Sequence, residues 1–286
     1  MPVRTPEQWT LVSVLADYLL LHSVCDDHAR CMSHTVRMLG EQGVGTADQL
    51  TSSCVSMMCE SIRAKAKASS TIANHRRIAL TLWRHAVGRG WATGPVEARP
   101  VRVRLPVVRA WSGDEIIRLL KFVKSNIGDM RSGASKSEFW RAFILLGYES
   151  GLRLGDLLEL ELTDFDQGFH CLMSKTSKTQ ELVTRHLSAA CAIAVHDLFV
   201  HSPDDRLFAW ALSRRHVKAQ FSRLVAGAGL TGSVRWLRRS GATACESQAP
   251  GSASRFLAHR SPGVAGKHYV DWSKVTKQPT VPSLEG

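Results

Sequence analysis

Four residues in the second half of the chain have side chains that together can bind and attack a phosphate. Arg153 and Arg238 carry planar guanidinium groups, each of which matches two phosphate oxygens in a way that a lysine does not. His259 can donate to the same group, and the Tyr269 hydroxyl can act as a nucleophile. Their order and spacing predict a single phosphate-handling site.

Each residue also has a simpler explanation when it is taken alone. Arg153 follows Gly151 at a predicted helix boundary, where a surface arginine would fit equally well. Asp156 can hold the Arg153 guanidinium in one pose, or can simply interact with the helix dipole. Tyr269 can be an ordinary half-buried aromatic. A phenol is a poor nucleophile unless a base or a positive charge assists it, so a tyrosine alone does not indicate catalysis. The combination of residues therefore carries the prediction.

A predicted helix over 235–246 carries three arginines. Arg235 and Arg238 lie at i and i+3 and should share a face, whereas Arg239 should point elsewhere. A solvated basic face is the alternative, but apolar residues along the same helix should fix its orientation.

Two lysines lie in a predicted hairpin, whose strands are expected at 169–173 and 181–183 around a polar turn. Lys175 or Lys178 can reach a leaving oxygen as a general acid. Solvated turn lysines are the simpler alternative.

Composition favours an anionic partner. The chain has 286 residues, a formal net charge of +12 and 44% hydrophobic residues, so it can bury a core and still present a basic surface. No apolar run reaches the ~18 residues that a bilayer span needs. The N-terminus lacks a signal-peptide pattern, and the seven cysteines are irregularly spaced. We expect reduced thiols, no membrane, and a cytoplasmic, nucleoid-associated protein.

Cysteine and histidine alternate at every third position in Cys25, His28, Cys31 and His34. On a helix, successive members turn by about 300°, so the four side chains fan out and do not converge on one ion. A closed zinc site needs four convergent ligands, so we expect no metal here.

The chain divides into two predicted domains. Residues 1–97 read as a helical domain, 98–111 as a basic extended linker, and 112–286 as a second domain with a C-terminal tail. Pro95 comes just before the linker, and Pro100 and Pro106 lie in it. Helices are expected from Thr5 as cap to Leu19, over 26–39, around Leu50 to Ile62, and over 70–87, then from a capping box at Ser112, over 139–150, near 188–200, 213–226, 235–246, 252–258 and 264–270.

Taken together, the motifs of the second domain resemble the catalytic domain of the tyrosine recombinase (phage-type integrase) family over about 108–275. Arg153 matches the first arginine, Arg238 the second, His259 the His/Trp position and Tyr269 the nucleophile. Lys175 falls where the β-hairpin lysine belongs, with Lys178 as the second choice. The first domain resembles the family's helical, SAM-like core-binding domain.

The resemblance implies a mainly α fold with a small β-sheet: a core-binding domain followed by an α+β catalytic domain. It implies a clamp around double-stranded DNA and a site-specific recombinase that works through a 3′-phosphotyrosyl intermediate, without metal or other cofactor. It also implies a homo-tetramer on DNA, formed from monomers or dimers. Six residues of the first domain are candidates for DNA contact: Lys65, Lys67, Thr71, Asn74, Arg76 and Arg77. A solvated helix face is the alternative for them.

Two positions depart from the family pattern. Arg235 stands where the family usually has a histidine; it can donate to a phosphate but cannot act as a base. Ala258 replaces a common glycine before His259. The first change leaves open a catalytically degenerate DNA-binding relative.

A different enzyme class is the other alternative. A basic helical nuclease or RNA-binding factor would fit the charge, and a metal-dependent nuclease would need Asp156, Asp164 and Asp166 as ligands.

Overall fold

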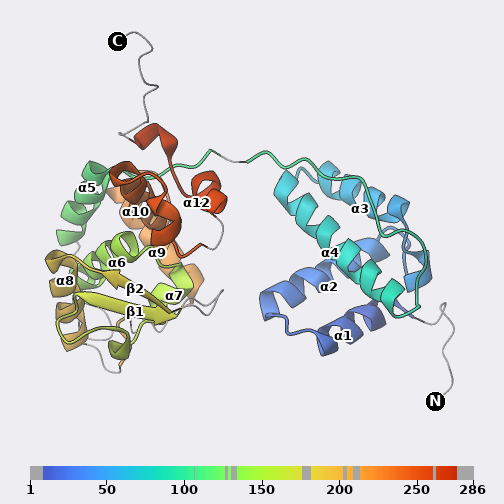
Figure 1. The fold of residues 1–286 in the computed structure, drawn as a ribbon, viewed down its shortest axis with the longest axis horizontal. Coiled ribbons are helices and arrows are strands. Elements are labelled where there is room, and N and C mark those ends of the chain that lie inside the picture. Colours follow the sequence, from blue (N-terminus) through green and yellow to red (C-terminus); the bar gives the residue numbers. More distant parts are fainter. Residues whose placement is uncertain are drawn as a thin grey trace, which may run out of the picture. The chain divides into compact units, whose positions relative to one another are not determined.

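The protein folds as two compact units, Met1–Leu105 and Pro106–Gly286, in a computed structural model (Figure 1). The structure describes residues 9–105, 107–125, 128–129, 134–175, 182–201, 205–208, 213–259 and 262–275. The predicted fold class, mainly helical with a small sheet, is confirmed. The division between the units falls inside the predicted linker 98–111.

Within the described residues, the first unit is built from α-helices and a short 3-10 helix. Its elements are α1 Leu11–Leu21, α2 Asp26–Gly40, η2 Ala47–Gln49, α3 Ser52–Ala64 and α4 Ser69–Gly88. The prediction that Thr5 caps the first helix is wrong for α1, which begins at Leu11. Thr10 is its N-cap: it is extended, accepts from the Ser13 amide and bridges Thr46. Thr5 itself lies outside the described residues.

The core of the first unit comes from one apolar side of each helix. Val14, Met32, Met58 and Leu82 are almost fully buried. Part of the predicted linker also packs here, since Val101 lies against this core. The first unit therefore includes residues that the sequence assigned to an extended connection.

The second unit places a two-stranded sheet among helices. Its helices are α5 Gly113–Lys124, α6 Lys136–Ser150, α7 Leu154–Leu158, η3 Leu162–Asp164, α8 Ala189–Val200, α9 Arg214–Gly227, α10 Arg235–Gln248, α11 Ser252–Phe256, α12 Pro262–His268 and η4 Trp272–Lys274. Capping boxes start α5 and α6: Ser112 with Glu115, as predicted, and Ser135 with Glu138.

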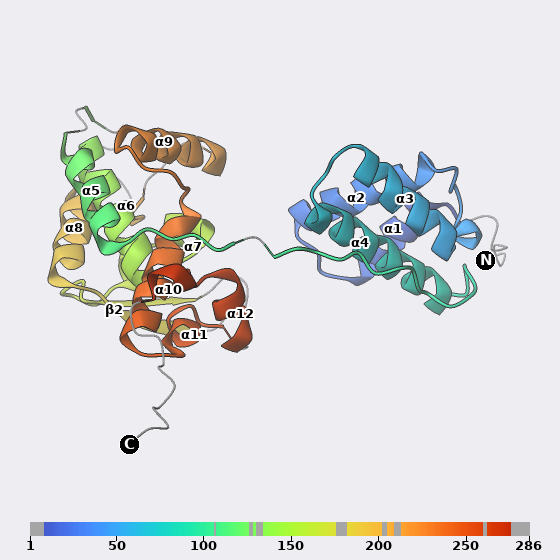
Figure 2. The ribbon, with the colours of Figure 1, turned by 90° about the horizontal axis from the view of Figure 1, so that it is seen from above.

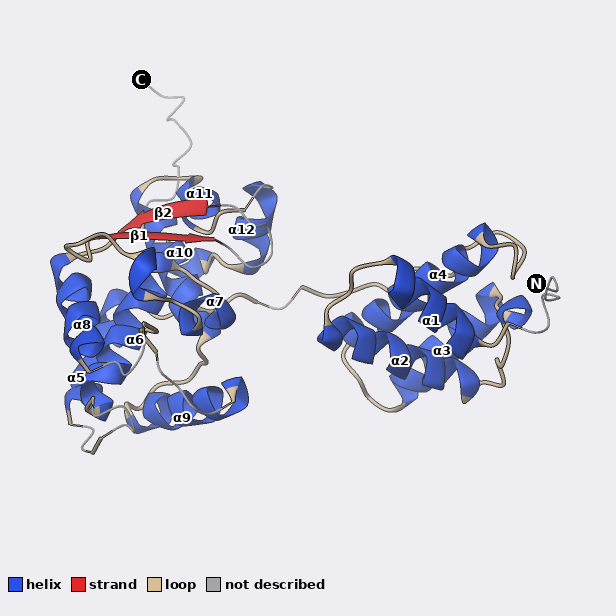
Figure 3. Cartoon of the chain, turned by 90° about the horizontal axis from the view of Figure 1, so that it is seen from below, coloured by secondary structure: helices blue, strands red, loops and turns tan. Residues whose placement is uncertain are grey.

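Strands β1 (Cys171–Lys175) and β2 (Leu182–His186) pair antiparallel, with Leu172 opposite Arg185. The predicted hairpin is thus confirmed, although both strands extend further along the chain than expected. Figures 2 and 3 place this sheet and helices α10–α12 on one side of the unit and α9 on the opposite side.

Helix α6 runs through the core of the second unit and packs on α5, α8 and α10. Phe143 on α6 is fully buried, and its ring contacts the rings of two other buried residues, Phe208 before α9 and Phe221 on α9. This aromatic core fixes α6, whose last residue precedes the first arginine motif. None of the helices in the described ranges is long and apolar enough to cross a bilayer.

A buried histidine makes the first unit sensitive to acid. His75 is 6% exposed and its Nδ1 shares a hydrogen bond of 2.8 Å with the Thr35 hydroxyl. Burial, with a smaller contribution from the charge of His34, lowers the pKa of His75 below its ordinary 6.5. The unfolded chain therefore binds this proton more readily, and protonation favours unfolding.

We expect the free energy of unfolding to fall as the pH drops below about 6.5, and His75→Gln to flatten this dependence. Thermal unfolding of the full chain at several pH values between 7.5 and 5.5 measures the effect. His22→Gln, at an exposed histidine of the same unit, should leave the slope unchanged. Equal pH slopes in the parent and His75→Gln would contradict the prediction.

Candidate active site

Arg153 projects from a sharp bend between α6 and α7. Gly151 ends α6 in the left-handed conformation (φ 61°), and a Cβ there would lie 2.5 Å from the Phe256 ring. Glycine is therefore required at this position both for its backbone conformation and for the close approach of α11. Arg153 is the N-cap of α7, and its guanidinium lies 3.7 Å from the buried carboxylate of Asp156. The predicted Arg153–Asp156 pair is thus present.

Arg238 joins the separate motifs. Its side chain is buried at 5% exposure and donates to the carbonyls of Gly151 and Leu257 and to His259 Nε2, the last two at 3.1 and 3.2 Å. Its guanidinium carbon lies 5.0 Å from the centre of the Tyr269 ring. Burial lowers the pKa of Arg238 to about 10, so the group is charged at neutral pH. One cation thus contacts the ends of three motifs.

His259 and Tyr269 face each other at the opening of this cluster. Their ring centres are 4.9 Å apart, with an angle of 62° between the planes. His259 follows Ala258, which adopts the left-handed conformation (φ 51°). An alanine costs about 1–2 kcal/mol more there than in an ordinary conformation, which gives the glycine of the family pattern a physical reason.

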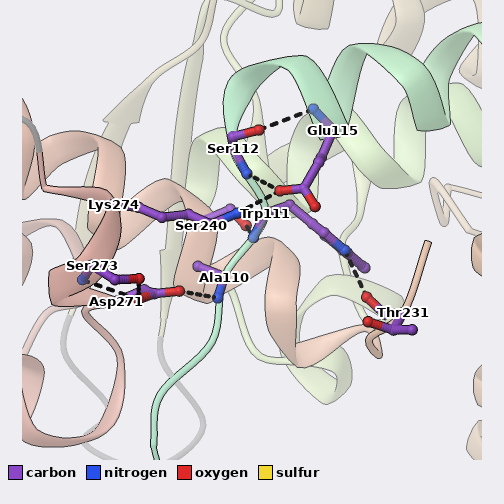
Figure 4. A network of polar contacts seen from close by, with 9 residues as sticks. All are labelled: Ala110, Trp111, Ser112, Glu115, Thr231, Ser240, Asp271, Ser273 and Lys274. Atoms are coloured by element: carbon purple, nitrogen blue, oxygen red, sulfur yellow. Dashed lines mark hydrogen bonds and ion pairs between the residues drawn. The ribbon is translucent and has the colours of Figure 1, made fainter.

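The segment just after Tyr269 is held in place by a polar network (Figure 4). Asp271 accepts from the Ala110 amide at 3.0 Å, and its own amide donates to the Thr243 hydroxyl at 3.0 Å. Lys274 forms an ion pair with Glu115. The network joins the segment after Tyr269 to the first residues of this unit, Ala110 and Glu115 among them. Contacts within the same chain therefore hold the backbone next to Tyr269. Sequence reasoning missed these residues, because their contacts join positions far apart.

The other two arginines of α10, Arg235 and Arg239, are more exposed than Arg238. Arg235 is exposed, although it lies one helical turn from the buried Arg238. Arg239 is half-buried, and its pKa is lowered by burial and by the charge of Arg235, while Tyr269 acts in the opposite direction. Arg239 thus lies in a less buried environment than Arg238, and its direction relative to the other two arginines stays a prediction.

The hairpin lysines cannot be compared in the same way. The backbone of Lys175 ends β1, but its side chain lies outside the described part of the chain, and so does Lys178. On the neighbouring strand, Arg185 is buried at 6% exposure, and its pKa responds to the charges of Asp156 and Arg153. Sequence reasoning missed Arg185; its only signal is the inward position between Val183 and Leu187.

The predicted DNA contacts of the first unit have different environments. Lys67, Thr71 and Arg77 are exposed, and Lys65 is an exposed partner of Glu41 at 3.5 Å. The two remaining members serve the fold: Asn74 donates to Cys31 Sγ at 3.3 Å, and Arg76 donates to the carbonyls of Ala98 and Arg99. The four exposed residues are therefore accessible to an anionic surface, although Lys65 is paired with Glu41 and Arg77 donates to Asn74 Oδ1 at 3.1 Å.

Two of the carboxylates that a metal-dependent nuclease would need accept hydrogen bonds from nearby backbone amides. Asp164 accepts from the Glu161 amide at 2.9 Å, and Asp166 accepts from the Cys171 amide at 2.7 Å. Across the described ranges, no three His, Cys, Asp or Glu side chains are grouped to hold a metal ion.

Comparison with known proteins identifies a family. The model of the phage integrase family matches residues 110–275. Among curated proteins, none matches the sequence. Solved structures with a similar fold include a lambda integrase dimer bound to a COC′ core site (TM-score 0.73, 19% identity, 96% of this chain and 81% of that chain).

Two further structures are similar in fold. The Tn1549 transposon integrase in complex with circular intermediate DNA gives a TM-score of 0.70 at 13% identity, over 95% of this chain and 100% of that chain. The XerH site-specific recombinase bound to a palindromic difH substrate gives 0.66 at 15% identity, over 83% and 74%.

Close packing of α10 on α6 sets the position of Arg238 and can be tested. A Cβ at Gly241 would overlap the Tyr148 carbonyl and lie 2.8 Å from the Phe256 ring. We expect Gly241→Ala to lower the free energy of unfolding by about 1–3 kcal/mol, because the backbone of α6 cannot yield. Denaturant unfolding measures this change. Gly113→Ala is the control, since a Cβ there meets nothing within 4 Å; equal stability of the two variants would contradict the packing argument.

Proposed function

Because the chain belongs to the phage integrase family, we propose that it is a tyrosine-type site-specific DNA recombinase that cleaves and rejoins strands through a 3′-phosphotyrosyl intermediate. The observation that carries the proposal is the Arg238 cluster. A buried guanidinium there contacts Gly151, beside the first arginine motif, as well as His259, and lies over the ring of Tyr269. This constellation can stabilise a phosphate under attack by a phenol hydroxyl.

In the proposed reaction the Tyr269 hydroxyl loses its proton to solvent, its oxygen forms a bond to the scissile phosphorus, and the bond from phosphorus to the 5′-oxygen breaks. Arg153 and Arg238 stabilise the charge that develops on the phosphate oxygens, and His259 donates a hydrogen bond. Lys175 gives a proton to the departing 5′-oxygen. A 5′-hydroxyl of another strand then reverses these steps, so the phosphotyrosyl bond retains the energy needed for rejoining.

The proposed partner is double-stranded DNA, bound by a clamp of the two domains. Two similar structures hold lambda integrase as a dimer on a core site and as a tetramer on a Holliday junction. For this chain we propose a tetramer on DNA as well. The exposed cations Lys65, Lys67 and Arg77 would contribute to backbone contacts in the first unit.

One observation favours a second candidate, a DNA-binding relative that does not cleave. Arg235 takes the place of the usual histidine and is exposed, and an arginine cannot accept a proton at neutral pH. Against this candidate, Arg238, His259 and Tyr269 are in mutual contact. Covalent capture of DNA separates the two.

We expect Tyr269→Phe to abolish covalent capture of nicked duplexes in metal-free buffer while DNA binding survives, because only the attacking oxygen is removed. A denaturing gel that detects protein shifted by attached DNA measures capture. The library of nicked duplexes has to be varied in sequence, so that a cognate site is present.

Tyr18→Phe is the matched control, since it removes a hydroxyl from the first unit and should leave capture intact. Capture that persists in Tyr269→Phe would reject Tyr269 as the nucleophile. Salt-sensitive binding with no capture by the parent, across a library shown to contain a bound sequence, would support the non-cleaving relative.

Variants of two neighbouring arginines on α4, Arg76 and Arg77, can distinguish a role in DNA contact from a role in folding. We expect Arg77→Gln to reduce the slope of log affinity against log salt by about 0.9, the value for one phosphate neutralised in B-DNA. Arg76→Gln should leave the slope unchanged and lower the thermal stability, because Arg76 holds the carbonyls of Ala98 and Arg99.

Fluorescence anisotropy with random-sequence duplex at several salt concentrations measures the slopes. Identical slopes in the parent and Arg77→Gln would place Arg77 outside the DNA interface, and an affinity that does not vary with salt would reject the basic surface as a whole.

A further inference from the structure

Arg185 is a buried cation that the proposed reaction does not use. It lies on β2, is 6% exposed, and donates through one terminal nitrogen to the Ser174 hydroxyl at 3.3 Å and the Val183 carbonyl at 3.4 Å. Its Nε and second terminal nitrogen are buried and have no hydrogen-bond partner among the described residues. Burying a charged group in this way is costly, so such a residue calls for an explanation.

Arg185 lies beside the phosphate-handling cluster. It lines one cavity with Phe256, whose ring packs against Gly151, and the Gly151 carbonyl accepts from Arg238. Burial lowers the pKa of Arg185 to about 10; the Asp156 carboxylate acts in the opposite direction, and the Arg153 charge in the same direction as burial. Arg185 in turn contributes to the lowered pKa of Arg238. The Asp156 Oδ2 is also buried with no hydrogen-bond partner among the described residues, and Arg153 is 3.7 Å from it.

The charges of these four residues do not balance. Arg153, Arg185 and Arg238 carry three positive charges against the single carboxylate of Asp156. A phosphodiester carries one negative charge and gains a second when an anionic oxygen adds to it. The excess in the cluster therefore matches the charge of a phosphodiester in the course of this attack.

We propose that Arg185 is a third arginine of the phosphate site, whose charge acts together with those of Arg153 and Arg238 on a bound phosphate and is retained for the anion at a cost to the fold. The inference rests on the proposed function, since the phosphate belongs to the DNA strand that Tyr269 would attack.

A structural role is the main rival. Through Ser174 and Val183, Arg185 could serve only to hold the hairpin, and its removal would then destabilise the unit without affecting an anion. A second rival is a cavity of about 330 Å³ that Arg185 borders together with Ser252, between β2 and the turn from α10 to α11. An anion bound there would not depend on Arg238.

The experiment compares Arg185→Met, Arg185→Lys and a control, Arg223→Met, which removes an exposed arginine of α9. Binding of inorganic phosphate to the full chain is measured by calorimetry at low salt, and thermal unfolding is measured without phosphate. We expect Arg185→Met to weaken phosphate binding by about tenfold or more, the size of one charge-assisted contact. Arg185→Lys should retain most of the affinity, and Arg223→Met all of it.

Stability separates the functional from the structural role. We expect the Tm of Arg185→Met to equal or exceed that of the parent, because methionine fills a similar space without a buried charge. A lower Tm with unchanged phosphate affinity, or failure of Arg185→Met to fold, would overturn the proposal. A parent that binds no phosphate, or binding that Arg238→Met leaves intact, would overturn it as well.

Covalent capture then distinguishes this inference from the proposed function. Phosphate binding that depends on Arg185, in a protein that never captures DNA through Tyr269, would keep the anion site and reject strand cleavage. Tyr269-dependent capture at an unchanged rate in Arg185→Met would keep the recombinase and reject the role of Arg185. A substrate with a neutral methylphosphonate at the scissile position adds a further comparison. On this substrate the capture rate of Arg185→Met should fall less far below that of the parent than on the phosphodiester, because less charge has to be stabilised.

Discussion

The buried guanidinium of Arg238 is the interaction on which the rest of the site depends. It reaches the carbonyl at the end of α6, the carbonyl at the end of α11 and the ring of His259, and it lies over the ring of Tyr269. These contacts require α10 to approach α6 and α11 closely, which explains why Gly151 and Gly241 leave no space for a side chain. The Arg238 side chain thereby brings motifs that are separate in sequence into one site. The aromatic core that packs against α6 supports this site from below.

The same cluster contains several features that destabilise the folded state. Arg238 and Arg185 each bury at least one nitrogen that has no hydrogen-bond partner within the described part of the chain, and Ala258 adopts a conformation that disfavours a side chain. A fold selected for stability alone would replace these features at little loss. Their concentration around Arg238 supports the proposed site for an anionic substrate.

The motifs identified the centre of the site from sequence because their chemistry is local. A glycine that ends a helix before an arginine, a histidine after a short helix, and serine-glutamate capping boxes each act within a few residues, and the structure brings Arg238, His259 and Tyr269 into contact. Three features were not predictable in this way. Arg185 could not be recognised, because a strand pattern shows which face a residue takes but not whether a charge there is buried. Asp271 bonds to Ala110 across most of the unit. Thr10, not Thr5, caps α1, and Thr10 also bridges Thr46, a contact between distant segments that the local pattern does not show.

The first turns of α10 suit the proposed phosphate partner. Arg235, Arg238 and Arg239 all lie near its N-terminus, and the first turn contains no acidic residue. Positive side chains are unfavourable there, because the helix dipole already places positive partial charge at that end. In the proposed complex the arrangement would become favourable, since the backbone amides and the guanidinium groups would act on the same negative charge. In this view the exposed Arg235 gains a role only when a phosphate is present: it cannot take a proton, but it can add to the field that stabilises the charge on the phosphate. The substitution that departs from the family pattern is thus compatible with binding of a phosphodiester, and the question it raises concerns the transfer of protons.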